Sequence, residues 1–134
     1  MNKVLIVHTA WYEDYISTMV DTSIKNLEKD FEYDIAIAAG SIELAALAKN
    51  IILQKKYVGI LFHGIVIRGE TSHYDLVTNE TFRSIGSLAE NFYDLAIINN
   101  VICVENEDQL KERLIKVTLN NTNALIDLIN EKSS

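Results

Sequence analysis

Residues with chemical potential gather directly after an apolar stretch that runs from Tyr57 to Ile67. There the polarity changes abruptly, and Arg68 to His73 supply a guanidinium, a carboxylate, two hydroxyls and an imidazole. Consecutive backbone N–H groups and the hydroxyl of Thr71 suit a phosphate, and the imidazole of His73 suits proton transfer near neutral pH. Taken alone, the segment is explained equally well as a turn with a capping histidine.

Two earlier segments carry residues of a similar kind. Trp11 is the only tryptophan, and it is explained more simply as a packing aromatic than as a flat platform on which a heterocycle stacks. Further along the chain, Gly40 permits a tight turn and Ser41 suits the N-cap of a helix. Glu43 complements the dipole of that helix. If it points into a crevice instead, its carboxylate suits the hydroxyls of a sugar or polyol.

A later segment combines acidic residues with an arginine. Asn106 and Gln109 have the spacing of a capping box, so we expect the last helix to begin there. The acids at positions 105 to 108 suit the first turn of that helix. Arg113 on the same helix is explained most simply as a solvated side chain, and its functional alternative is a guanidinium fork for phosphate.

The histidines and the cysteine predict no metal site. His8 and His63 lie within apolar strands, where we expect structural roles, and their spacing is not that of metal ligands. Cys103 is the only cysteine, which excludes an internal disulfide and a cysteine-based zinc cluster. Its apolar neighbours favour a buried thiol over a nucleophile. We therefore expect no metal site.

Two periodicities alternate along the chain and predict the elements that position these residues. The predicted strands are Val4 to Val7, Asp34 to Ala39, Val58 to Ile67 and a fourth within Leu95 to Val104. The predicted helices have apolar faces made of Ile16, Met19, Val20, Ile24 and Leu27, of Leu44, Leu47, Ala48 and Ile51, of Phe82, Ile85, Leu88, Ala89 and Phe92, and of Leu110, Leu114, Val117, Leu125 and Leu128.

This alternation predicts an α/β fold, specifically a three-layer α/β/α sandwich of flavodoxin-like type with a four-stranded parallel sheet. No linker or repeat divides the chain, so we expect a single domain over residues 1–134. Two polar stretches weaken the pattern. We expect Asn99 and Asn100 to interrupt the fourth strand, and residues 120–123 to break or kink the last helix.

Composition narrows the class of partner. The 12 basic and 19 acidic residues give a net charge of -7, which argues against nucleic acid and anionic membranes. The apolar stretches are far shorter than the ~20 residues of a membrane span, and the sequence enters a strand without a signal peptide. A cytoplasmic enzyme or binding domain is the expected class.

In their order along the chain, these segments resemble the lumazine synthase family. The stretch from Val66 to Asp75 reads closely as the signature of that family after its third core strand. Gly40-Ser41-Ile42-Glu43-Leu44, Trp11, and Asp108-Gln109 followed by Arg113 resemble its other conserved elements. The resemblance extends over about residues 3 to 130.

The resemblance implies an enzyme of riboflavin biosynthesis. It would condense 5-amino-6-(D-ribitylamino)uracil with 3,4-dihydroxy-2-butanone 4-phosphate to 6,7-dimethyl-8-ribityllumazine, without metal or redox cofactor. Members form pentamers or multiples of pentamers, with active sites between adjacent subunits. By this resemblance, His73 moves protons. The uracil substrate is bound by Trp11, Ser41, Ile42, Glu43, Ile65, Val66, Ile67 and the neighbouring subunit's Asn99. The phosphate substrate is bound by Glu70, Thr71 and the neighbouring subunit's Arg113.

Several positions depart from the family pattern. Asn99 stands where the family has an aromatic ring, a loss of about 1 kcal/mol of stacking, and Tyr12 or Phe62 is left open as a substitute. Ile65 stands where the family has Thr or Val, and His63 stands where it has an aliphatic residue. Asn121 stands near the place of a lysine that supports phosphate binding in the family. Only three residues precede the first strand, which favours a free pentamer or a pair of pentamers over a shell of sixty subunits.

Three alternatives stand beside an active synthase. The first is a divergent relative that binds flavins or lumazines without turnover, motivated by Asn99 and the missing lysine. The second is a riboflavin synthase of the archaeal type, which has no need of a phosphate-binding segment. The third is a generic flavodoxin-like binding module.

Overall fold

The computed structural model describes residues 1–70 and 72–133. One parallel sheet with the order β2-β1-β3-β4 lies at its centre. The strands are β1 (Lys3–Thr9), β2 (Glu32–Ala38), β3 (Gly59–Ile67) and β4 (Ala96–Val104). The four predicted strands are confirmed, with ends that differ by at most two residues.

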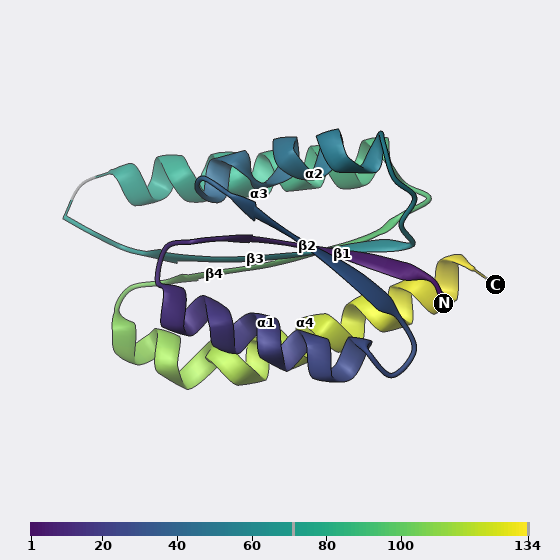
Figure 1. Ribbon diagram of the computed structural model, residues 1–134. Helices are drawn as coiled ribbons and strands as arrows, with labels where there is room; N and C mark the ends of the chain where they lie inside the picture. Colours follow the sequence, from purple (N-terminus) through teal and green to yellow (C-terminus); the bar gives the residue numbers. More distant parts are fainter. Residues whose placement is uncertain (71, 134) are drawn as a thin grey trace.

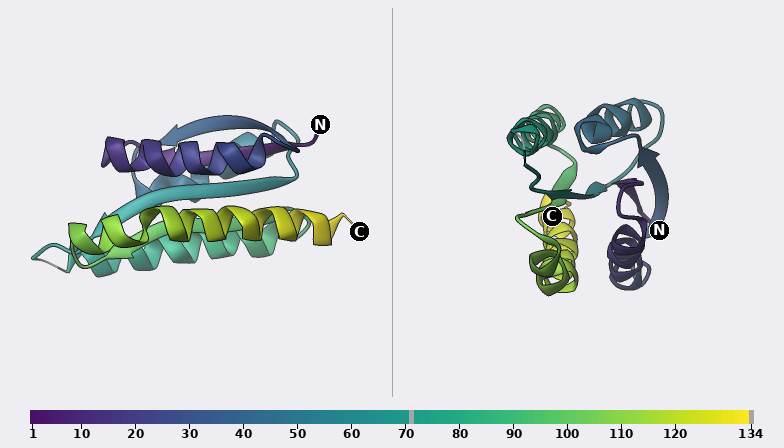
Figure 2. Two further views of the ribbon diagram at one scale, coloured as in Figure 1. Left: turned by 90° about the horizontal axis from the view of Figure 1, so that it is seen from below. Right: turned by 90° about the vertical axis from the view of Figure 1, so that its left-hand side faces the viewer.

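Helices cover both faces of the sheet. They are α1 (Glu13–Leu27), α2 (Leu44–Ile52), α3 (His73–Asn91) and α4 (Glu107–Lys132), with a short 3-10 helix η1 (Ser41–Glu43) before α2. Figures 1 and 2 show α2 and α3 on one face and α1 and α4 on the other, which confirms the three-layer sandwich. Within the described residues, no helix is both long and apolar enough to cross a membrane.

The central strand β3 explains why an uninterrupted apolar stretch, rather than an alternating one, occurs in the sequence. Its first seven residues are buried, because β3 lies between β1 and β4 and is covered on both faces. Phe62 packs in the cluster under α2 and α3, whereas Leu61 packs in the cluster under α1 and α4. This burial holds the carboxyl end of β3 in a defined place.

The predicted buried face of α3 is wrong at one position. Phe82 is 49% exposed, whereas Thr81 is completely buried. The buried positions of this helix are Thr81, Ile85 and Leu88. Because successive helical residues differ by about 100°, Phe82 lies outside this stripe. Periodicity predicts an aromatic side chain in the buried stripe, whereas the structure places the smaller Thr81 there.

A buried polar network keeps both β4 and α4 continuous, which corrects the two expected interruptions. Asn100 donates through Nδ2 to His63 Nδ1 and to Thr118 Oγ1, at 2.9 Å each. Its Oδ1 accepts from Asn121 Nδ2 at 2.7 Å. The polar residues within β4 and α4 therefore satisfy one another, and α4 runs unbroken through residues 120–123.

The same network defines the tautomer of His63. Since Nδ1 accepts from Asn100, the ring hydrogen lies on Nε2, which donates to Ser23 Oγ at 2.9 Å. Ser23 Oγ in α1 also lies 3.1 Å from Thr122 Oγ1 in α4. The expected structural role of His63 is confirmed, because this neutral ring connects β3 with β4 through Asn100 and with α1 through Ser23.

The side chain of Cys103 is half-buried in β4. Burial raises the pKa of its thiol to about 11. A nucleophilic cysteine requires the opposite shift. The structure thus agrees with a packing role for this residue.

Candidate active site

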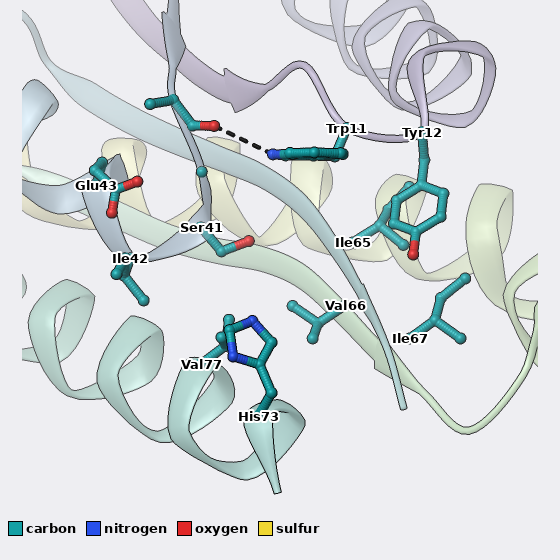
Figure 3. A pocket seen from close by; sticks show the side chains of 12 residues that line it. Trp11, Tyr12, Ser41, Ile42, Glu43, Ile65, Val66, Ile67, His73 and Val77 are labelled. Carbon is teal, nitrogen blue, oxygen red and sulfur yellow. Dashed lines mark hydrogen bonds between the residues drawn. The ribbon is translucent and has the colours of Figure 1, made fainter. Parts of the chain in front are cut away.

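The carboxyl ends of β1, β2 and β3 border a cleft of about 510 Å³ (Figure 3). The order β2-β1-β3-β4 changes direction between β1 and β3, and ligands of open α/β sheets bind at such a switch point. Eight residues expected at the site line this cleft: Trp11, Ser41, Ile42, Glu43, Ile65, Val66, Ile67 and His73.

The loop after β1 brings two aromatic side chains to the cleft. Trp11 is 67% exposed, so it is not a core residue. Its Nε1 donates to the carbonyl of Ala39 at 3.3 Å, which links this loop to the end of β2 (Figure 3). Tyr12 has φ 61°, and it is the only described residue other than glycine with a positive φ. This left-handed residue precedes α1 directly, and such strained positions are frequent at functional sites.

The end of β2 places a hydroxyl and a carboxylate at the cleft. A Cβ on Gly40 would lie 3.0 Å from Glu43 Oε1, so a side chain here would press on this carboxylate. Ser41 is the first residue of η1 and makes no capping hydrogen bond, so the expected N-cap is wrong. Its Oγ instead lies close to Gly64 of β3, 3.5 Å from where a Cβ would be.

Three consecutive residues at the end of β3, Ile65, Val66 and Ile67, line the cleft. Ile65 and Ile67 pack in the cluster beside α1 and α4, whereas Val66 belongs to the cluster on the opposite face. The side chains of this strand end are therefore divided between two cores.

His73 forms the opposite border. It is the first residue of α3, and its side chain is exposed. In Figure 3 its imidazole lies across the cleft from the ring of Trp11, with Ser41 and Val66 between them. Val77, one helical turn later, also lines the cleft. An imidazole on one side and a flat aromatic ring on the other suit a heterocyclic reactant that exchanges protons.

Three expected site residues do not line the cleft of their own chain. Glu70 is exposed beyond the end of β3. Asn99 lies on β4, where its Oδ1 accepts from the backbone N–H of Val101 at 2.8 Å. Arg113 is exposed on α4, which covers the other face of the sheet (Figure 1). Thr71 falls outside the described residues.

The cleft contains little charge. Glu43 is its only carboxylate among the described lining residues, and neither lysine nor arginine lines it. In the part of the chain that the structure describes, no group of three or more His, Cys, Asp or Glu side chains is placed to hold a metal ion. The cleft by itself therefore suits a neutral heterocycle better than an anion.

Comparison with known proteins assigns the chain to a family. The chain matches the family model of 6,7-dimethyl-8-ribityllumazine synthase over residues 1–131. The chain belongs to the 6,7-dimethyl-8-ribityllumazine synthase family. It is 36% identical over 112 residues to the 6,7-dimethyl-8-ribityllumazine synthase of Bartonella tribocorum, covering 82% of this chain and 74% of that protein.

Two further relatives carry the same family name. The chain is 36% identical over 112 residues to 6,7-dimethyl-8-ribityllumazine synthase 1 of Rhizobium meliloti, covering 79% of this chain and 72% of the relative. It is 30% identical over 116 residues to the 6,7-dimethyl-8-ribityllumazine synthase of Neisseria gonorrhoeae, covering 84% and 73%. The flavodoxin-like fold expected from the sequence agrees with this lumazine synthase membership.

Four lining residues of this lumazine synthase family member were not among the expected site residues: Tyr12, Ala39, Gly40 and Val77. Val77 follows His73 by four residues, so helical spacing alone predicts that the two share a face. Tyr12 depends on a left-handed backbone that no periodicity reveals. Of the two aromatics considered as substitutes at Asn99, Phe62 is completely buried in the core, and only Tyr12 reaches the cleft.

Proposed function

We propose that the chain is a transferase of riboflavin biosynthesis that condenses 5-amino-6-(D-ribitylamino)uracil with 3,4-dihydroxy-2-butanone 4-phosphate to 6,7-dimethyl-8-ribityllumazine. The family match over residues 1–131 carries this proposal, since the matched range contains every lining residue of the cleft. The cleft volume of about 510 Å³ also lies within the range of roughly 300–1,000 Å³ typical of small-molecule sites.

The chemistry requires only proton transfers and the departure of phosphate. The 5-amino group attacks the ketone, and loss of water gives an imine. Elimination then releases phosphate, and attack by the ribityl-bearing nitrogen with loss of a second water closes the ring. An imidazole suits these steps because it can accept and return a proton near neutral pH. His73 at the border of the cleft is the proposed group.

The uracil substrate is proposed to occupy the space between Trp11 and Val66. The exposed ring of Trp11 offers a stacking surface. Backbone groups from Ile65 to Ile67 suit the edge of the pyrimidine, and Ser41, Ile42 and Glu43 suit the ribityl chain, with the carboxylate accepting from its hydroxyls. The low charge of the cleft suits this placement, because the uracil ring is a neutral heterocycle.

The phosphate substrate is proposed to bind at the end of β3 with help from a neighbouring subunit. Glu70 and Thr71 would contribute backbone N–H groups and the Thr71 hydroxyl. Arg113 and Asn99 would come from the neighbour, which is consistent with their absence from the cleft of their own chain. A homopentamer, free or in multiples, is the proposed assembly, and the cytoplasm is the proposed compartment.

The direct test mixes both substrates with the purified protein and follows the absorbance and fluorescence of the lumazine. We expect lumazine to form faster than in a protein-free control, because the condensation also proceeds without enzyme. Unchanged rates with measurable binding of the lumazine would instead support a non-catalytic binding protein. Conversion of added lumazine to riboflavin would support a riboflavin synthase.

Removing the stacking surface is expected to weaken binding of the uracil substrate. Trp11→Ala should raise its KM about fivefold, since an aromatic stacking pair contributes about 1 kcal/mol beyond area burial. The free energy of unfolding should change little, because Trp11 is 67% exposed. Steady-state kinetics with Tyr93→Ala as control would check this, as Tyr93 is similarly exposed at 76% but lies outside the cleft. An equal KM in both variants would contradict the stacking role.

A further inference from the structure

The first observation concerns the place where β3 leaves the sheet. The backbone N–H of Arg68 donates to the carbonyl of Val104 at 2.9 Å, which extends the pairing of β3 with β4 by one residue. The side chain of Arg68 also points toward the end of β4. Arg68 Nε donates to both carboxylate oxygens of Glu105, at 2.8 and 3.0 Å. Backbone and side chain together therefore attach the segment after β3 to the end of β4.

The other side of the same guanidinium contacts the start of α3. Arg68 Nη1 lies 3.5 Å from Asp75 Oδ1, and the guanidinium carbon lies 4.2 Å from the centroid of the Tyr74 ring. Tyr74 and Asp75 directly follow His73 in the first turn of this helix. One side chain thus joins the ends of two strands to the turn that carries the imidazole.

The start of α3 has no side-chain cap at its N-cap position. Ser72 occupies the N-cap position, but its side chain makes no capping hydrogen bond. Backbone contacts help to close the turn, since the N–H groups of Asp75 and Leu76 donate to the carbonyl of Ser72 at 3.1 and 3.3 Å. An uncapped helix end frays readily. The contacts of Arg68 supply what the cap does not.

We propose that Arg68 is a positioning residue that holds the first turn of α3 and thereby directs His73 toward the cleft. The inference rests on the proposed function for the role of His73. It also assigns Arg68 away from phosphate binding, although Arg68 is the nearest arginine in the sequence to the expected phosphate segment. Two carboxylates offset its charge, and one face of the guanidinium is covered by Tyr74.

Kinetics separate a positioning role from a binding role. Arg68→Gln and Glu105→Gln should each lower kcat about tenfold, because small displacements of a catalytic group reduce rates strongly. The KM for the phosphate substrate should stay within about threefold. The double variant should be no slower than the slower single variant, since both changes break the same contact.

A matched control for the pair of Arg68 and Glu105 lies on α3. Arg83 pairs with Glu80 through two hydrogen bonds of 2.6 Å, and neither residue lines the cleft. Arg83→Gln removes an arginine–glutamate pair of the same kind and should leave kcat and KM unchanged. If Arg68→Gln and Glu105→Gln behave like this control, the proposal is wrong. A tenfold rise in KM for the phosphate substrate in Arg68→Gln, with no effect of Glu105→Gln, would make Arg68 a phosphate ligand instead.

A second measurement does not depend on enzyme activity. Amide hydrogen exchange at Asp75 and Leu76 should become about tenfold faster in Arg68→Gln and Glu105→Gln, but not in Arg83→Gln. Unchanged exchange would overturn the positioning role even in an active enzyme. Faster exchange in a chain that makes no lumazine would leave this role intact and contradict only the proposed function.

Discussion

Acidification is expected to destabilise the fold through a single buried histidine. Below about pH 6.5, the free energy of unfolding should fall by about 1.4 kcal/mol for each pH unit on account of His63 alone. The effect should continue toward pH 3, because burial lowers the pKa of His63 to about 3, with a smaller contribution from His8. Over two pH units it amounts to about 2.7 kcal/mol, a large part of the stability of a small protein.

The sign follows from which state binds the proton. In the unfolded chain His63 takes up a proton near its ordinary pKa of about 6.5. In the folded chain it stays neutral, since its side chain is completely buried and Nδ1 already accepts from Asn100. Between these two pKa values the unfolded state binds more protons, so stability decreases as the pH falls.

Chemical denaturation between pH 7.5 and 4.5 would measure this effect. His63→Gln is the informative variant, because a carboxamide can still accept from Asn100 and donate to Ser23 but does not titrate. Its stability should depend less steeply on pH, by about one proton. His8→Gln is the control, since His8 is only half-buried. An equal pH dependence in His63→Gln and the native chain would contradict the expectation.

Asp34 adds an effect of the same sign in a different pH window. The hydrogen bond from Tyr57 Oη at 2.6 Å, followed by the charges of Lys3 and Lys55, lowers the pKa of Asp34 below its ordinary 3.8. Its stabilising contribution is complete above that value and is lost only at more acidic pH. A loss of stability that begins near pH 6.5 and is absent in His63→Gln therefore reports on His63.

The second large effect is expected on catalysis. His73→Gln should lower kcat about a hundredfold, the lower end of what a positioned general acid–base group contributes. The KM for both substrates should change little, because glutamine keeps the size and the hydrogen-bonding capacity of the side chain. Initial rates of lumazine formation, corrected for the uncatalysed reaction, would measure it. A variant with native kcat would exclude His73 as the proton carrier.

Mixing variants tests whether the site is shared between subunits. Arg113→Ala should raise the KM for the phosphate substrate while leaving His73 intact. When His73→Gln and Arg113→Ala chains are refolded together, some clefts combine a native His73 with a native Arg113 from the neighbour. Activity should then exceed the sum of the two separate variants. A rate equal to that sum would place both residues in the site of one chain.

Much of the site could be predicted from the sequence, because the carboxyl ends of parallel strands meet at one edge of the sheet. Trp11, Glu43 and His73 each follow a predicted strand, and the structure brings them to one cleft. Periodicity failed where a polar side chain replaces an apolar one, as with Thr81 and Phe82 in α3. The preference of serine for helix N-caps failed at Ser41, which lies inside the short helix η1 instead of capping a helix.

The sequence by itself determined the α/β class, the four strands and the family, since these depend on local periodicity and on a contiguous segment from Val66 to Asp75. Only the tertiary structure decided which polar groups are partners. His63 is satisfied by Asn100 and Ser23, and Arg68 by Glu105, at separations of 37 to 40 residues. Such contacts depend on how strands and helices are placed beside one another. For that reason the tautomer of His63, the continuity of α4 and the position of Arg68 follow from the fold.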